Sequence, residues 1–137
     1  MTTTTSTPTD HHLDTITHPR ARPFFLLDAA LTGVNGLAYL AAAPLLADWF
    51  GTGTLLLREL GALLLVIAAG VAWLAARPSI PRRGATILVE INALWVVASI
   101  GYALLGDLTD LGRGWVLLQA ALVGGFAAVQ LWFVRRG

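Results

Sequence analysis

The stretch at residues 55–76, LLLRELGALLLVIAAGVAWLAA, decides the fold of this chain. From residue 60 to residue 76 it contains no charged side chain, and a helix that is apolar on all sides is not a surface helix of a soluble protein. An α-helix rises about 1.5 Å per residue, so about 20 residues cross the roughly 30 Å hydrocarbon core of a bilayer. The stretch therefore predicts a membrane-spanning helix.

Three further stretches have the same length and character, at residues 24–47, 84–105 and 114–134. Backbone groups in lipid must be satisfied within the protein, so apolar runs this long and continuous are helical. The segments between them are short and rich in turn-forming residues. The sequence therefore predicts an all-α fold, a bundle of four transmembrane helices.

Composition supports this prediction. Of the 137 residues, 56% are hydrophobic and 12% are charged, whereas a soluble domain carries about 25% charged residues. A soluble core of this size could not bury so much apolar surface. The net charge of +1 gives no reason to expect nucleic acid as a partner, and the absence of cysteine excludes disulfides, thiolate metal sites and cysteine nucleophiles.

The first 23 residues differ from the rest of the chain. They are polar and rich in threonine, and such a segment has too little apolar surface to fold, which predicts a disordered cytoplasmic tail at residues 1–23 and a membrane domain at residues 24–137. All three histidines lie in this tail. We therefore expect no metal site and no cofactor in the bundle.

The arginines predict how the bundle is oriented. Seven of them fall on one side of the predicted helices and two, Arg58 and Arg113, on the other. Because cytoplasmic loops carry the excess of positive charge, we expect both termini to be cytoplasmic in an inner (plasma) membrane. The seven are Arg20, Arg22, Arg77, Arg82, Arg83, Arg135 and Arg136.

A weak internal repeat divides the chain into two halves. A shift of 57 positions pairs Asn35 with Asn92 and Thr52 with Thr109, and polar identities within apolar sequence are less expected by chance than apolar ones. This repeat indicates two tandem helical hairpins.

Polar and aromatic residues recur at helical spacing in three of the four stretches, which places each set on one helix face. Such faces normally turn inward, since amide and charged groups in lipid cost about 2.5–3.5 kcal/mol. We expect a polar core near Asn35 and Asn92, which is either a ligand or proton pocket or a set of interhelical packing contacts. The residues are Asp28, Thr32, Asn35 and Tyr39, then Asn92, Trp95, Ser99 and Tyr102, and finally Gln119 and Gln130.

Two acidic residues within the predicted helices require separate interpretations. Asp28 is either a functional group or a side chain that reaches back to Arg20 or Arg22. Glu90 lies about 9 Å inside its helix, counted from residue 84, and points about 200° away from Asn92. It must therefore face another helix, a second protomer or the Arg82–Arg83 pair, as a proton carrier, a partner contact or an ion pair.

Three segments resemble known sequences. They are LLDAALTGVNGLAYL at residues 26–40, NALWVVAS at residues 92–99 and LLQAALVGGFAAVQLWFVRR at residues 117–136. Together they are similar to a group of small four-helix integral membrane proteins of high-GC bacteria and, more distantly, to the DoxX-like family. The resemblance implies the four-helix architecture and brings no catalytic residues with it.

The sequence contains no Ser–His pair, phosphate-binding loop or paired acidic motif. We therefore expect a non-enzymatic protein with an accessory or scaffolding role in the bilayer, in a homo-oligomer or a larger membrane complex. The alternative is a small transporter or binding protein for a small cationic or amphiphilic solute, which would use Asp28 or Glu90.

Overall fold

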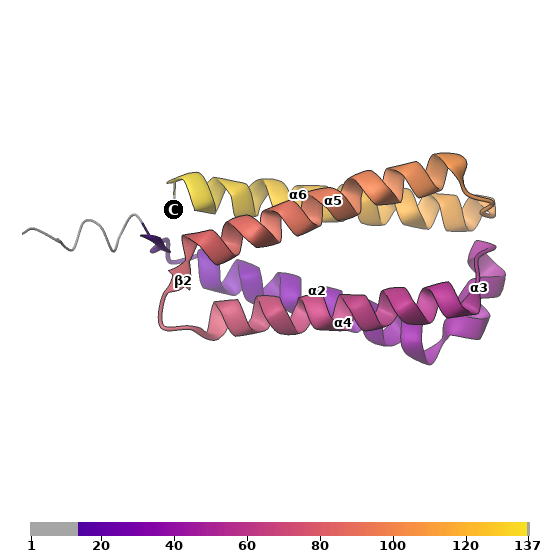
Figure 1. The fold of residues 1–137 in the computed structure, drawn as a ribbon, viewed down its shortest axis with the longest axis horizontal. Coiled ribbons are helices and arrows are strands. Elements are labelled where there is room, and N and C mark those ends of the chain that lie inside the picture. The colour runs from indigo at the N-terminus through magenta and orange to yellow at the C-terminus, as the bar shows by residue number, and fades with distance from the viewer. Residues whose placement is uncertain (1–13, 137) are drawn as a thin grey trace, which may run out of the picture.

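The computed structural model describes residues 14–136 and is all-α apart from two very short strands (Figure 1). Four of its helices are long and apolar enough to cross a membrane, so the predicted four-helix fold is confirmed. In chain order the elements are β1 (Thr15–Ile16), α2 (Ala21–Ala41), α3 (Ala43–Phe50), α4 (Thr54–Ala76), β2 (Ile80–Pro81), α5 (Arg82–Leu105) and α6 (Asp110–Arg136).

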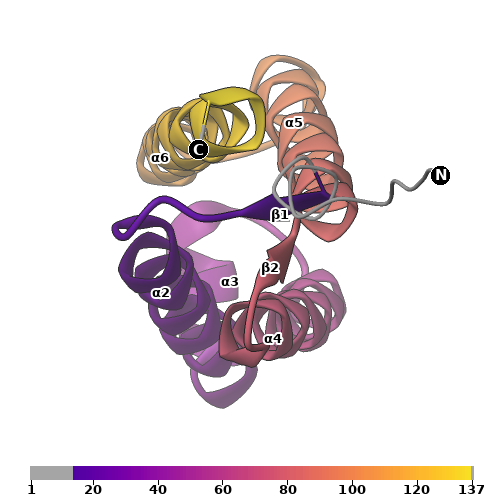
Figure 2. The same cartoon turned by 90° about the vertical axis from the view of Figure 1, so that its left-hand side faces the viewer.

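The helices pack as two hairpins, as the repeat predicted. Helix α2 lies along α4, and α5 lies along α6, whereas contact between the hairpins is sparse (Figures 1 and 2). Most of the close packing is therefore inside each hairpin, and the apolar side chains that are not packed face outward. Leu55, Val66 and Leu105, for example, are 69%, 69% and 88% exposed.

A pair of glycines sets the crossing of α2 and α4. A Cβ atom on Gly36 would lie 2.8 Å from the carbonyl oxygen of Gly61, and one on Gly61 would lie 2.8 Å from the carbonyl oxygen of Gly36. Small residues let transmembrane helix backbones approach closely. These two glycines therefore let the backbones of α2 and α4 approach closely.

The first predicted helix, at residues 24–47, is in fact two helices. Helix α2 ends at Ala41 and α3 begins at Ala43, with Pro44 in its first turn. Proline has no N–H to donate, and its ring collides with the carbonyl group four residues back, so the α2 helix cannot continue through it. Helix α3 then runs to Phe50 and ends at Gly51 with a φ of 72°, so part of the predicted connecting segment is helical.

The described part of the N-terminal tail is packed and not free. Thr15 and Ile16 pair with Pro81 and Ile80 as antiparallel strands, and both isoleucines are buried. The Arg82 guanidinium donates to the carbonyl oxygens of Thr15 at 2.9 Å and of Val134. The predicted disorder of residues 1–23 is therefore wrong for residues 14–23, because backbone pairing and a few apolar side chains attach them to the bundle; residues 1–13 lie outside the described residues.

The opposite end of the bundle joins the hairpins through α3. The backbone N–H of Thr109 donates to the carbonyl oxygen of Phe50 at 3.0 Å. The Thr109 hydroxyl donates to the carbonyl oxygen of Trp49 at 2.6 Å. The same hydroxyl accepts from the N–H of Gly112 at 3.0 Å and so caps the start of α6. Helix α6 consequently begins at Asp110, four residues earlier than predicted.

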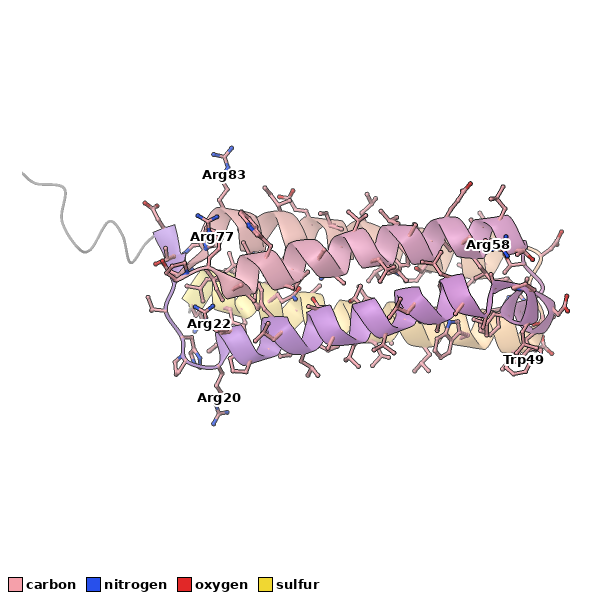
Figure 3. All side chains as sticks on the ribbon, turned by 90° about the horizontal axis from the view of Figure 1, so that it is seen from below. Arg20, Arg22, Trp49, Arg58, Arg77 and Arg83 are labelled. Carbon is pink, nitrogen blue, oxygen red and sulfur yellow. The ribbon has the colours of Figure 1, made fainter. Side chains whose placement is uncertain are left out.

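Within residues 14–136, the charged residues other than Asp28 and Glu90 lie near the two ends of the bundle, with largely apolar surface between them. Figure 3 shows Arg20, Arg22, Arg77 and Arg83 at one end, and Arg58 with Trp49 at the other. We call the first the arginine-rich end and the second the α3 end. Together with the four apolar helices, this distribution makes the chain a multi-pass membrane protein.

Candidate functional site

A cavity of about 610 Å³ lies between the two hairpins, toward the α3 end. Helices α2 and α6 form its side walls, and Leu64 of α4 and Trp95 of α5 contribute to its base. Several lining residues of α2 and α6 are also exposed, including Val34 at 67% and Leu122 at 55%. The cavity therefore opens sideways between α2 and α6, onto the surface that faces lipid.

The cavity wall is largely apolar and rich in aromatic rings. The rings of Phe50 and Trp115 stack with centroids 5.9 Å apart and an interplanar angle of 16°, which fixes their faces at the α3 end of the cavity. Phe126 lies toward the other end, where its ring is 4.9 Å from that of Phe24. Leucine and valine side chains fill the remaining wall.

A first polar group lies within this wall. The Tyr39 hydroxyl accepts a hydrogen bond from the Trp115 indole N–H at 2.8 Å and donates to Gln119 Oε1 at 2.9 Å. Asn35 lies beside Tyr39 and lines the cavity as well. Within residues 14–136, the amide nitrogen of Gln119 has no hydrogen-bond partner, so it can donate to a molecule in the cavity.

A second polar group closes the inner end of the cavity. Asp28 accepts hydrogen bonds from the Thr32 hydroxyl at 3.0 Å and from Gln130 Nε2 at 2.5 Å. Gln130 Oε1 in turn accepts from Asn92 Nδ2 at 2.8 Å. Asp28, Asn92 and Gln130 are all buried, and their hydrogen bonds connect α2, α5 and α6. We call these hydrogen-bonded side chains, with Thr32, the Asp28 network.

These two groups correct the predicted polar core. Asn35 and Asn92 were expected together, but Asn92 joins Asp28 and Gln130. Asn35 lies beside Tyr39, about two helical turns along α2 from Asp28. The alternative that Asp28 reaches the arginines is also wrong. Arg22 donates to the carbonyl oxygens of Ala75 and Pro78, the latter at 3.2 Å, and Asp28 is satisfied from within the bundle.

The remaining predicted residues lie in different places. Trp95 lines the cavity, and Ser99 is half-buried on α5. The Tyr102 hydroxyl is 2.6 Å from that of Thr52, outside the cavity at the α3 end. Glu90 is exposed on the outer side of α5, so it does not face another helix of this chain.

Trp115 was not among the residues predicted for the polar core, although a signal was present. Trp115 precedes Gln119 by four residues and so lies on the same face of α6. Its role depends on Tyr39, which lies 76 residues earlier in the chain.

Among residues 14–136, no group of three or more His, Cys, Asp or Glu side chains could hold a metal ion.

Replacing Tyr39 with phenylalanine should loosen the wall of the cavity. The substitution removes the partner of the Trp115 N–H and of Gln119 Oε1, and losing such bonds costs about 1–2 kcal/mol. We expect a lower free energy of unfolding in detergent and a shift in tryptophan emission. Tyr102→Phe is the matched control, because that hydroxyl has one partner, Thr52, outside the cavity; equal emission shifts in both variants would argue against this role of Tyr39.

Comparisons of the chain with protein-family models, with curated proteins and with solved structures found no match. Of the resemblance drawn from the sequence, only the four membrane-length helices are therefore confirmed.

Proposed function

We propose that this chain is a non-enzymatic membrane protein that binds an amphiphilic small molecule, taken up sideways from the bilayer into the cavity between α2 and α6. The observation that carries the proposal is the cavity itself. Its volume of about 610 Å³ lies within the range of roughly 300–1,000 Å³ that is common for small-molecule sites. Such sites combine mostly apolar walls with a few polar groups that fix orientation, as this one does.

The chemistry of the wall defines the kind of ligand. Leucine, valine and aromatic side chains suit an acyl or ring-bearing apolar part. Gln119 and Asn35 suit a head group that forms hydrogen bonds. Both Asp28 oxygens already accept hydrogen bonds from Thr32 and Gln130, so we favour a neutral hydrogen-bonding head group over a cationic one.

The accessory role expected from the sequence is the second candidate. It is favoured by the Asp28 network, whose three helices are joined by side chains with satisfied hydrogen bonds, as expected of packing contacts. We also keep the expected setting as part of the proposal: an inner membrane, both termini cytoplasmic, and a homo-oligomer or larger complex. The arginine asymmetry supports this orientation.

Ligand binding is tested with a brominated long-chain alcohol, which quenches tryptophan fluorescence on contact. Added to the purified protein in micelles, it should produce saturable quenching, because Trp95 and Trp115 line the cavity. Val123→Phe places a ring inside the cavity and should weaken binding of this probe about tenfold or more, since overpacking a filled site is unfavourable. Mass spectrometry of an organic extract of the same preparation should find a co-purified amphiphile in the wild type, depleted in Val123→Phe.

The matched control is Val129→Phe on the same helix. Val129 is exposed and does not line the cavity, so this variant should bind the probe like the wild type. The accessory role would be the better candidate if quenching never saturates, has the same slope in all three proteins, and no amphiphile co-purifies.

A further inference from the structure

Glu90 differs from every other polar side chain on the membrane-facing surface. Within residues 14–136, the exposed polar residues of the four long helices lie in the first two or last two turns of each helix. Glu90 is the sole exception. Arg58 and Glu59 lie in the second turn of α4, and the remaining exposed charges on these helices are at helix ends. The apolar surface around Glu90 thus contains a single carboxyl group.

Its depth makes this position costly. Glu90 lies about 5 Å along the axis from the midpoint of α5, at a rise of about 1.5 Å per residue. With the midpoint of α5 at the bilayer centre, the edge of a hydrocarbon core of about 30 Å is roughly 10 Å away. This is too far for a glutamate side chain to reach. Carboxyl groups at such depth normally pair with another polar group or face the protein interior.

The chain itself offers Glu90 no partner within the described residues. No hydrogen bond or ion pair joins it to residues 14–136. Arg82 is engaged by carbonyl oxygens of Val134 and Thr15, and Arg83 extends away from the bundle at the arginine-rich end (Figure 3). The ion pair with Arg82 or Arg83 considered from the sequence is therefore not formed.

We propose that the outer face of α5 is a dimer interface, in which Glu90 pairs with Glu90 of a second copy of this chain. Two copies in one membrane share the same orientation, and a two-fold axis along the membrane normal places the same residue of each at the same depth. One carboxyl group, when protonated, donates a hydrogen bond and the other accepts it. No arginine lies at this depth on any described helix, so contact with another face of a second copy would leave Glu90 unpaired.

The residues around Glu90 form a surface that suits such pairing. Ile87, Leu94, Val97 and Leu104 are 51%, 69%, 68% and 70% exposed, and their spacing of three and seven residues matches the seam of parallel helix pairs. Gly101 lies in the same row, and a Cβ atom there would meet nothing within 4 Å. Because a side chain at residue 101 would contact nothing in this chain, the glycine leaves room there for close approach of a second helix. This interface is separate from the cavity, so the inference does not depend on the proposed ligand.

The natural absence of cysteine allows a direct test by cross-linking in liposomes of the purified protein. Single cysteines at Leu94 or Val97, treated with a membrane-permeant oxidant, should give a disulfide-linked dimer at low protein-to-lipid ratios. Val66→Cys on the outer face of α4 is the matched control, because that residue is as exposed as Leu94, at 69%. It should cross-link weakly, and equal cross-linking at all three positions would mean random collision and would overturn the proposal.

Substitutions of Glu90 then separate pairing from a structural role. Glu90→Leu should weaken dimerisation about tenfold, measured by energy transfer between labelled copies diluted into lipid, whereas Glu90→Gln should retain it because an amide also donates and accepts. Glu59→Gln, a surface acid at the other end of the bundle, is the control. Three results would each overturn the second copy as the partner. They are dimerisation of Glu90→Leu at the wild-type level, a wild-type protein that is monomeric, and cross-linking in cells to a different protein.

Discussion

Replacing Gln130 with leucine should destabilise the protein more than any other single substitution in the Asp28 network. Gln130 is fully buried, donates to Asp28 and accepts from Asn92. Leucine of similar size removes both bonds and leaves the Asp28 carboxyl without its partner on α6. Loss of a buried hydrogen bond to a charged group costs about 1.5–3 kcal/mol, and the stranded Asn92 amide adds about 1–2 kcal/mol more.

The free energy of unfolding in mixed micelles, followed by circular dichroism, is the measurement for this variant. Asp28→Leu combined with Gln130→Leu should recover part of the loss, because replacing both partners with apolar groups is far less costly than removing one. If the double variant is as unstable as the sum of the two single variants, the bond between these side chains does not hold the hairpins together.

Gly61→Val should separate α2 from α4. A Cβ atom at Gly61 would lie 2.8 Å from the Gly36 carbonyl oxygen and 3.0 Å from the Tyr39 Cβ. The nearest obstacle is backbone, which cannot rotate away as a side chain can. The helices must therefore move apart, and overpacking of this kind costs about 3 kcal/mol or more.

Gly70→Val tests this expectation with the same substitution in the same helix. A Cβ atom at Gly70 meets nothing within 4 Å, so this variant should unfold near the wild-type midpoint. Because Gly61 also adjoins Tyr39, Gly61→Val should lose binding of the brominated alcohol together with stability. A stable Gly61→Val protein would mean that the hairpin does not cross at these glycines.

Length and hydropathy were sufficient to predict the four long helices, because a membrane imposes its thickness on every span. The break at Ala42 could also have been read from Pro44, which ends a helix wherever neighbouring packing does not accommodate it. The two hairpins followed from short connections and from the weak repeat. The lengths of the apolar stretches and of the connections between them are thus strong evidence for the number of spans and for how they pair.

Pairing between helices was less accessible from the sequence. Helical periodicity correctly placed Asp28 and Tyr39 on one inward face, but it does not say which residue of another helix lies at the same height. That height depends on helix tilt and on where each helix begins; α6 starts four residues earlier than predicted. The single polar core expected near Asn35 and Asn92 was therefore not found, and Asn92 donates instead to Gln130.

Sparse packing between the two hairpins has a mechanical consequence. They are tied at the arginine-rich end by β1, β2 and Arg82, and further along by the Asp28 network and by the Tyr39 hydrogen bonds to Trp115 and Gln119. At the α3 end, Thr109 bonds to Phe50 and Thr52 bonds to Tyr102. The backbones of the two hairpins approach each other far less than the two long helices within each hairpin do. The width of the gap along α2 and α6 therefore depends on a few hydrogen bonds, and a wider opening for an entering molecule requires the Tyr39 bonds to Trp115 and Gln119 to break.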